Sequence, residues 1–307
     1  YSLNDGTEQP LSIGPDGRRL WDAGDFNIDI DRSALGDGTN QVVVKATNGA
    51  GEQATKTVTV VYHKNTTWPL PYSIDWGAVS KIQDVAQVMD GQWTVGANGL
   101  HVSESEWGYD RVIALGDISW NDYTIQVPIT VHKIDPTAYT YKSGAPSIGI
   151  VFRWTGHTDE PVVCVQPKCG WWPWGGDAWF EFYKTQAGGD LYVEADPQLN
   201  APKDITPFPL ELGTPYTFTF RVKTDSAGSL YNLRVEGDGQ NVSLQVRGSP
   251  NGLARGSVLL VAHHVEATFG NVTLGQELYT LSTAVSPGGG GTISKSPDKS
   301  VYGKNET

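Results

Sequence analysis

The chain has 307 residues, a formal net charge of −12 and a pI near 4.9. This acidic balance argues against nucleic acid or an anionic membrane surface as a partner, because both are bound through basic patches. No apolar run reaches the ~18 residues of a membrane-spanning helix, while a hydrophobic share of 38% and an aromatic share of 10% are enough for a packed core. The composition fits a secreted protein that handles neutral glycans or divalent cations, and it also fits an acidic face that is only solvated.

Residues 1–63 contain short alternating runs between turn signals. The runs DFNIDID, NQVVVKAT and ATKTVTVVYH are predicted strands, and the last two are joined by the turn NGAGE. Through GDFNIDI, LGDGTNQVVVKATNGAGE and TVTVVY, the segment resembles the bacterial Ig-like modules of secreted surface proteins, which implies a small β-sandwich. The segment that starts at Tyr1 lacks the first strand or two of such a module, so we expect an upstream segment to complete it. The start without Met or a signal sequence predicts a processed or excerpted chain.

Residues 64–72, KNTTWPLPY, are predicted to form a linker stiffened by Pro69 and Pro71. From 73 to 279 the chain reads as a succession of strands without a convincing helix. In NDYTIQVPITVHKI, alternation predicts one shared face for Tyr123, Ile125, Val127, Ile129 and Val131. No βαβ alternation occurs, so the predicted fold class is all-β, with a small Ig-like sandwich followed by a larger β-sandwich.

The order of motifs in 73–279 adds a resemblance. W-x-V-x-x-x-G-L, DYTIQVPITV, GIVFRW, YTFTFRVKTD and GSVLLVAHHVEATFGNVTL together resemble the concanavalin A-like lectin and laminin-G-like jelly-roll group. The closing strand FGNVTL is the most specific element, and the resemblance implies that it returns beside the first strand of the domain. This fold hosts lectins, carbohydrate-binding modules, glycoside hydrolases and polysaccharide lyases, so it does not decide between them.

Residues 280–307 are predicted to be a linker or the start of a further repeat. YTLSTAVSPGGGGTISKSPDKSVY resembles the opening of repeat modules in bacterial cell-surface proteins. We therefore expect the chain to belong to a larger extracellular or cell-surface protein, with neighbouring domains or chains as partners.

Two predicted strands, 147–154 and 177–183, enclose a loop that holds three of the chain's 11 Trp residues, at 171, 172 and 174. Alternation predicts that Ile148, Ile150, Phe152 and Trp154 share one face, and that Trp179, Glu181 and Tyr183 share a face of the second strand. Cys164 and Cys169, the only cysteines, cannot build a structural zinc site alone. A disulfide is the preferred interpretation and implies an oxidising compartment, and two unpaired thiols are the alternative.

The Trp loop is the predicted glycan site. Flat aromatic rings cover the apolar faces of sugars, and planar or paired polar groups bind their hydroxyls. We expect stacking by Trp171, Trp172 and Trp174, with hydrogen bonds from a concave face that includes Gln126, Arg153, Glu181, Arg221 and His263. Trp179 and His157 are further candidates for the carbohydrate site. The competing interpretation is that these Trp residues form a buried plug beneath a disulfide loop.

Catalysis has weaker support in the sequence. The ExDxxE acids of jelly-roll glycanases are absent, as are the RxEx-R and QIH patterns of jelly-roll alginate lyases. A lyase that uses Arg153, His157 and Tyr183 as an unrecognised acid/base set remains an alternative.

Calcium is the metal expected, because acidic turn oxygens suit that hard cation. The candidate ligands are Asp75, Asp84, Asp110 and Asp177, and no EF-hand spacing selects among them. His263 and His264 are adjacent and point to opposite faces of a strand, so both are not expected to bind one ion. N-x-S/T sequons at Asn65, Asn241, Asn271 and Asn305 are possible glycosylation sites or chance occurrences.

Three functions follow from this sequence. The first is a carbohydrate-binding module of a larger secreted or cell-surface protein, which binds a polysaccharide or glycan. The second is a structural or adhesive subunit of a surface array or filament. The third is a polysaccharide lyase or glycoside hydrolase with an unrecognised active site.

Overall fold

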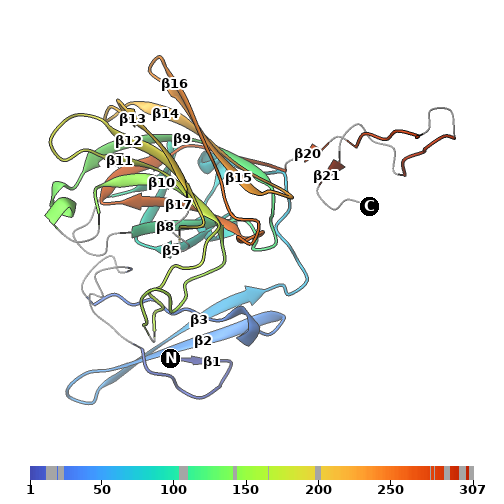
Figure 1. The fold of residues 1–307 in the computed structure, drawn as a ribbon. Helices are drawn as coiled ribbons and strands as arrows, with labels where there is room; N and C mark the ends of the chain where they lie inside the picture. Colours follow the sequence, from blue (N-terminus) through green and yellow to red (C-terminus); the bar gives the residue numbers. More distant parts are fainter. Residues whose placement is uncertain are drawn as a thin grey trace.

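The computed structural model describes residues 1–11, 19, 24–103, 110–140, 144–164, 166–197, 202–276, 278–279, 281–286, 291–296 and 302–303. Over these residues the fold is all-β: two large antiparallel sheets form a sandwich, and a small sheet lies at one side of it (Figure 1). The helical elements of this part are short 3-10 turns, η1 (Arg32–Ala34), η2 (Trp76–Ala78), η3 (Ile82–Asp84) and η4 (Pro136–Thr140). The predicted all-β sandwich is confirmed. None of the helices in the described ranges is long and apolar enough to cross a membrane.

One large sheet has seven strands. Their order is β13 (Lys203–Phe208), β12 (Gly189–Ala195), β11 (Gly176–Phe182), β10 (Ser147–Trp154), β17 (Ser257–His263), β8 (Asp110–Leu115) and β5 (Gln87–Asp90). β10 therefore lies at the centre of the sheet, between β11 and a strand more than 100 residues later in the chain. Such long-range pairing brings three distant segments onto one face.

The other large sheet has nine strands. Seven follow in the order β16 (Gln240–Arg247), β15 (Gly228–Gly237), β14 (Pro215–Asp225), β9 (Tyr123–Ile134), β18 (Val265–Phe269), β7 (Gly99–Val102) and β6 (Trp93–Gly96). β19 (Val272–Gln276) pairs with both β9 and β4 (Tyr72–Ile74), with Val272 opposite Ile74. The closing strand thus returns beside the first strand of the sandwich, as the motif FGNVTL predicts.

Alternating side chains build the core between the two sheets. The predicted face of β9 is confirmed, because Tyr123, Ile125, Val127, Ile129 and Val131 are each at most 1% exposed. Ile148, Ile150 and Phe152 of β10 join the same hydrophobic cluster from the seven-stranded sheet. Full burial of one large apolar side chain contributes about 1.5–3 kcal/mol, so this core accounts for much of the stability of the sandwich.

The N-terminal segment differs from the prediction. It forms one sheet of β1 (Ser2–Leu3), β2 (Gly38–Thr47) and β3 (Gln53–Tyr62), and Val42 is the one buried hydrophobic residue in its described part. A second sheet packed on this one is not found among the described residues 1–11, 19 and 24–63, so a separate Ig-like sandwich is not confirmed. DFNIDID is not a strand, because the backbone N–H of Asp29 donates to the side chain of Gln166 at 2.7 Å instead of to a neighbouring strand.

The two predicted linkers also have contacts. Trp68 and Leu70 pack against the core of the sandwich, and the Trp68 carbonyl accepts a hydrogen bond from the indole of Trp120 at 2.8 Å. Residues 64–72 are therefore attached to the larger unit. In the C-terminal segment, β20 (Leu278–Tyr279) pairs with β21 (Tyr302–Gly303), and a surface-protein repeat is not supported there.

Candidate functional site

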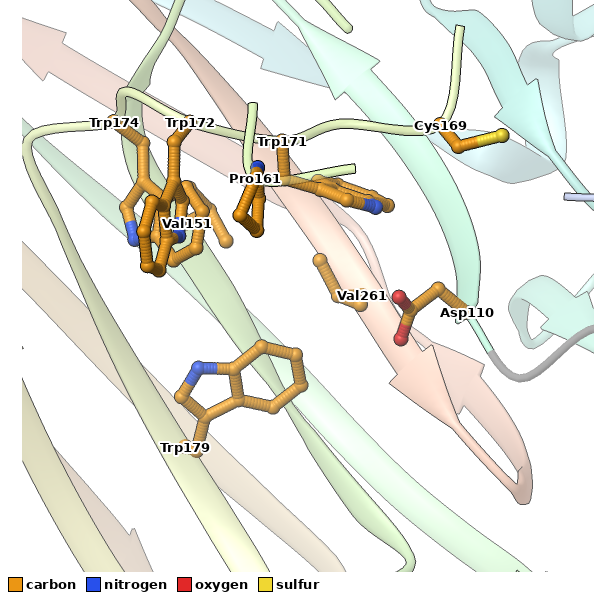
Figure 2. A pocket seen from close by; sticks show the side chains of 9 residues that line it. All are labelled: Asp110, Val151, Pro161, Cys169, Trp171, Trp172, Trp174, Trp179 and Val261. Carbon is orange, nitrogen blue, oxygen red and sulfur yellow. The ribbon is translucent and has the colours of Figure 1, made fainter. Parts of the chain in front are cut away.

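A pocket of about 220 Å³ lies on the outer face of the seven-stranded sheet. Its floor comes from the strands and its roof from the loop between β10 and β11, which we call the Trp loop (residues 155–175). In Figure 2, the indoles of Trp171, Trp172 and Trp174 hang from the loop on one side, and Trp179 rises from β11 on the other. The remaining lining residues are Asp110, Val151, Pro161, Cys169 and Val261. The structure thus brings all four predicted Trp residues to one pocket.

Backbone hydrogen bonds and a disulfide hold the Trp loop. Cys164 and Cys169 are bonded, as predicted, which excludes the two free thiols. The backbone groups of Thr158 and Gly170 pair in both directions at 2.8 Å, and a Cβ on Gly170 would lie 2.4 Å from the backbone nitrogen of Glu160. Only glycine allows so close an approach of the two arms of the loop.

The Trp loop is neither a free rim nor a buried plug. Trp171, Trp174 and Trp179 pack on a second hydrophobic cluster, made of residues on the outer face of the sheet and separate from the main core. Trp172 is outside that cluster and lies at 6.2 Å from Trp174, measured between ring centroids. All four Trp side chains are half-buried, so they combine a fixed position with an accessible ring surface.

Asp177 lies beneath this aromatic layer. It is 4% exposed, and its Oδ2 accepts a hydrogen bond from the Trp174 indole at 2.9 Å. Burial raises the pKa of the Asp177 carboxyl to about 7, although the Trp174 hydrogen bond acts in the opposite direction. Glu194 lies directly opposite on β12, and burial raises its pKa as well. Both groups are therefore easier to protonate than ordinary carboxyls.

Asp110 and His263 form a pair at the edge of the pocket. They are opposite each other on β8 and β17, and His263 Nδ1 is 2.9 Å from Asp110 Oδ1. The next residue, His264, lies between β17 and β18 with a φ of 52°, and its Nδ1 is 3.5 Å from Asp135 Oδ2. Its ring contacts that of His263, with 4.7 Å between centroids, so the predicted opposite faces of one strand do not apply to this pair. Burial lowers the pKa of His264 to about 4, helped by the neighbouring His263.

Arg153 is not on the binding face. A bulge after Phe152 and a φ of 55° at Arg153 reverse the alternation of β10, so Trp154 packs on the outer cluster and the guanidinium turns inward. Arg153 is fully buried and donates to Asp122, Ser229, Thr224 and the carbonyls of Asn121 and Leu253. Its prediction as a sugar-binding residue is wrong, as is the predicted inward face for Trp154.

The other polar candidates divide between the two sheets. Glu181 is half-buried on β11, on the same face as Trp179, as predicted. Gln126 is exposed on β9 and Arg221 lies on β14, both in the nine-stranded sheet. The sandwich core separates these two residues from the pocket, so the single concave face predicted for them does not exist.

His157, near the start of the Trp loop, has a buried side chain and does not line a groove. Its side chain is 1% exposed, it contacts the rings of Trp154 and Trp171, and its Nε2 is 3.1 Å from Asp90 Oδ2. Tyr183 lies beyond β11 and its hydroxyl donates to Asp190 at 2.5 Å. The predicted lyase set of Arg153, His157 and Tyr183 therefore does not converge.

The acidic candidates for calcium have separate roles. Asp75 caps η2 and bonds to Asn271, Asp84 is exposed on η3, and Asp110 and Asp177 have the partners given above. In the described part of the chain, no three His, Cys, Asp or Glu residues form a group that could hold a metal ion. The described acidic candidates therefore do not fit a calcium site.

The sequons also differ in their surroundings. Asn65, Asn241 and Asn271 are exposed, but the Asn271 amide donates to Asp75 at 3.0 Å and its carbonyl oxygen accepts from Trp76. Asn305 lies outside the described residues. Glycosylation at these positions remains a prediction.

Three pocket residues were not predicted as part of a site: Val151, Pro161 and Val261. Alternation along 257–263 places Val261 and His263 on one face, so the sequence alone could have identified Val261 as a neighbour of His263 on that face. The pairing of that strand with β10 and β8 joins residues more than 100 positions apart, and no local pattern indicates it.

No protein-family model and no curated protein matches the chain. Among solved structures it is similar to peanut lectin with a 9mer peptide, at 11% identity over 67% of this chain and 97% of that chain, with a TM-score of 0.46. It is also similar to the legume lectin-like domain from Entamoeba histolytica, at 8% identity over 66% of this chain and 95% of that chain, with a TM-score of 0.44. A third similar structure is the VIP36 exoplasmic/lumenal domain in its Ca2+/Man2-bound form, at 10% identity over 70% of this chain and 90% of that chain, with a TM-score of 0.43. TM-scores below 0.5 transfer neither a sugar site nor a calcium site to this chain.

Proposed function

We propose that the protein binds carbohydrate through the pocket between the Trp loop and the outer face of the seven-stranded sheet. The observation that carries this proposal is the convergence of four half-buried indoles from a disulfide-fastened loop and β11. A sugar ring has an apolar face that fits against an indole, while Asp110 in the lining supplies an acceptor for its hydroxyls. Glu181, on the same face of β11 as Trp179, offers a further acceptor outside the lining. The binding unit is the sandwich of the predicted domain 73–279 together with residues 64–72, which pack on it, and it is held within a larger extracellular or cell-surface protein.

The Trp rings of the pocket are held in fixed orientations, which favours a binding site over an apolar patch without a ligand. The Asp177 hydrogen bond orients Trp174, and the edge-to-face contact of His157 with Trp171 orients a second ring. Ordering these side chains before the ligand arrives lowers the entropic cost of binding.

Trp172→Ala is the sharpest test, because Trp172 lines the pocket but is not part of the outer hydrophobic cluster that stabilises the sheet. We expect glycan affinity to fall by about 1–3 kcal/mol, with less than ~1 kcal/mol lost from the free energy of unfolding. A broad glycan and polysaccharide panel on the full chain identifies the ligand, calorimetry measures the affinity, and product analysis for new reducing or unsaturated ends detects any cleavage.

Trp68→Ala is the matched control, since Trp68 is partly buried but packs on the main core away from the lining of the pocket. It should leave affinity unchanged. Equal losses of affinity in both variants, or no retention of the wild type on any glycan, would contradict the proposed function.

A structural or adhesive role in a surface array is the alternative. It is favoured by β3, the outer strand of the N-terminal sheet, where Val58 and Val61 are 48% and 59% exposed. Light scattering over a wide concentration range tests this role, and a monomer at every concentration would contradict it.

A further inference from the structure

The outer face of the seven-stranded sheet is acidic as well as aromatic. Residues that pair directly across antiparallel strands share a face, and Trp179 on β11 is opposite Tyr192 on β12. By the same pairing the described strands direct six carboxylates and one lysine to this face: Asp90, Asp110, Asp177, Glu181, Asp190, Glu194 and Lys203. Asp90 is ion-paired with the buried Arg19. Asp177 carries less than a full charge near neutral pH, because burial raises its pKa to about 7. The face still has a clear excess of negative charge.

The pocket has the same character. Among the described residues that line it, Asp110 is the one that carries a charge and none is cationic. In Figure 2, Asp110 lies on one side of Val261 and the rings of Trp174 and Trp179 lie on the other. The His263 hydrogen bond engages Oδ1 of Asp110, and Oδ2 accepts no hydrogen bond from the described residues. One end of the pocket therefore presents an oriented carboxylate oxygen.

A pocket that combines indole rings with the Asp110 carboxylate favours cationic ligands over neutral and anionic ones. The negative face of an indole attracts a cation within about 6 Å of the ring centroid, and a carboxylate strengthens that attraction. A neutral sugar gains only stacking and hydroxyl contacts here. A uronic acid would place a second carboxylate near Asp110, and like charges repel each other in this largely apolar pocket.

We propose that the pocket selects glycans that carry a free amino group, with the ammonium beside Asp110 and the sugar ring against the Trp side chains. This inference rests on the proposed glycan-binding function and specifies its ligand class. Loss of the ammonium charge, for example by N-acetylation, removes both the ion pair and the cation–π attraction while it leaves the ring faces unchanged.

The test compares three oligosaccharides of equal length: oligomers of glucosamine, of N-acetylglucosamine and of galacturonic acid. Calorimetry on the full chain at physiological ionic strength measures each affinity. We expect the glucosamine oligomer to bind at least tenfold more tightly than its N-acetylated counterpart, and the galacturonic acid oligomer to bind most weakly. Asp110→Asn keeps the acceptor for His263 and should reduce the tenfold preference to less than threefold.

Asp238→Asn is the matched control. Asp238 is exposed in the turn between β15 and β16 of the opposite sheet, with a φ of 49° that asparagine tolerates. It removes the same charge from the chain and should keep the full preference. If Asp238→Asn lowers the preference as much as Asp110→Asn, attraction to the overall charge explains the binding and the inference fails.

Other results would contradict the selection for an amino group without contradicting glycan binding itself. Equal affinity for the glucosamine and N-acetylglucosamine oligomers, with both lost in Trp172→Ala, overturns the charge selection and leaves glycan binding intact. Tightest binding of the galacturonic acid oligomer overturns it in the same way. No binding of any of the three oligomers also overturns it, and the broad panel then decides on the proposed function alone.

Discussion

Arg153 has a φ of 55°, in the left-handed region of backbone space, and this angle redirects the end of β10. The guanidinium then ties the two sheets of the sandwich together: it donates to Asp122 at 3.1 Å and to residues of β14 and β15. Because every contact is internal, its removal would leave the buried carboxylate of Asp122 without its cation.

Arg153→Ala should therefore lower the free energy of unfolding by at least about 3 kcal/mol, as expected when one partner of a buried ion pair is lost. Urea denaturation followed by Trp fluorescence measures the change. Arg234→Ala is the control, because Arg234 pairs with Glu236 on an exposed face and such pairs are worth at most about 1 kcal/mol. Equal effects of the two variants would show that the inward position of Arg153 is wrong.

The pKa of Asp177 predicts a pH dependence of stability. The folded-state pKa is about 7 against an ordinary value of 3.8, so the folded protein binds more protons than the unfolded chain between these values. This contribution to stability is present at low pH and is lost as the pH rises through about 7. His264 acts with the opposite sign, because its folded-state pKa is lowered to about 4.

Asp177→Asn isolates the contribution of the Asp177 carboxyl to the pH dependence of stability. The contribution of His264 is the same in the variant and in the wild type, so it cancels in their difference. The side-chain amide of this variant keeps an oxygen that can accept from the Trp174 indole. We expect the stability of the variant relative to wild type to increase by an amount on the order of a few kcal/mol between pH 4 and pH 8. Denaturation curves at both pH values test this, and a difference that does not change with pH would exclude a raised pKa for Asp177.

At the scale of elements, alternation explains what could be predicted. It identifies the buried faces of β9 and of most of β10, and it places Trp179 and Glu181 on one face of β11. The Gly- and Pro-rich surroundings of the Trp loop indicate a shaped turn, which the close contact of Gly170 with Glu160 explains. These signals are local, and the structure follows them.

Other features depend on contacts that are distant in the sequence. Gln126 and Glu181 have similar local patterns, and only strand pairing decides that they lie in different sheets. The bulge at Arg153 has no glycine to mark it, and the burial of His157 depends on Asp90. For this reason the aromatic half of the candidate site was predictable, whereas its polar half was not.

At the scale of the whole molecule, the N-terminal segment and the Trp loop share a buried polar network. The Arg19 side chain is 3% exposed and donates to Asp90, to Asp29 at 2.5 Å and to the carbonyl of Lys168 at 2.7 Å. Gln166 bonds to the backbone N–H of Asp29 at 2.7 Å and to its carbonyl at 3.0 Å. The contacts lie next to Cys169, which lines the pocket, so the N-terminal segment supports the wall of the site.

Arg19→Ala should consequently affect both stability and binding. It leaves the carboxylate of Asp90, which is fully buried, without its arginine, and we expect a loss of at least about 3 kcal/mol in the free energy of unfolding. Glycan affinity should fall as well, because the loop loses an anchor beside the disulfide. Arg32→Ala, an exposed residue of η1 in the same segment, should change neither quantity by more than about 0.5 kcal/mol. Denaturation, calorimetry and hydrogen exchange across residues 160–172 would distinguish the two variants. If Arg19→Ala lowers stability while exchange in the loop and glycan affinity stay unchanged, the network fastens the N-terminal segment without shaping the pocket.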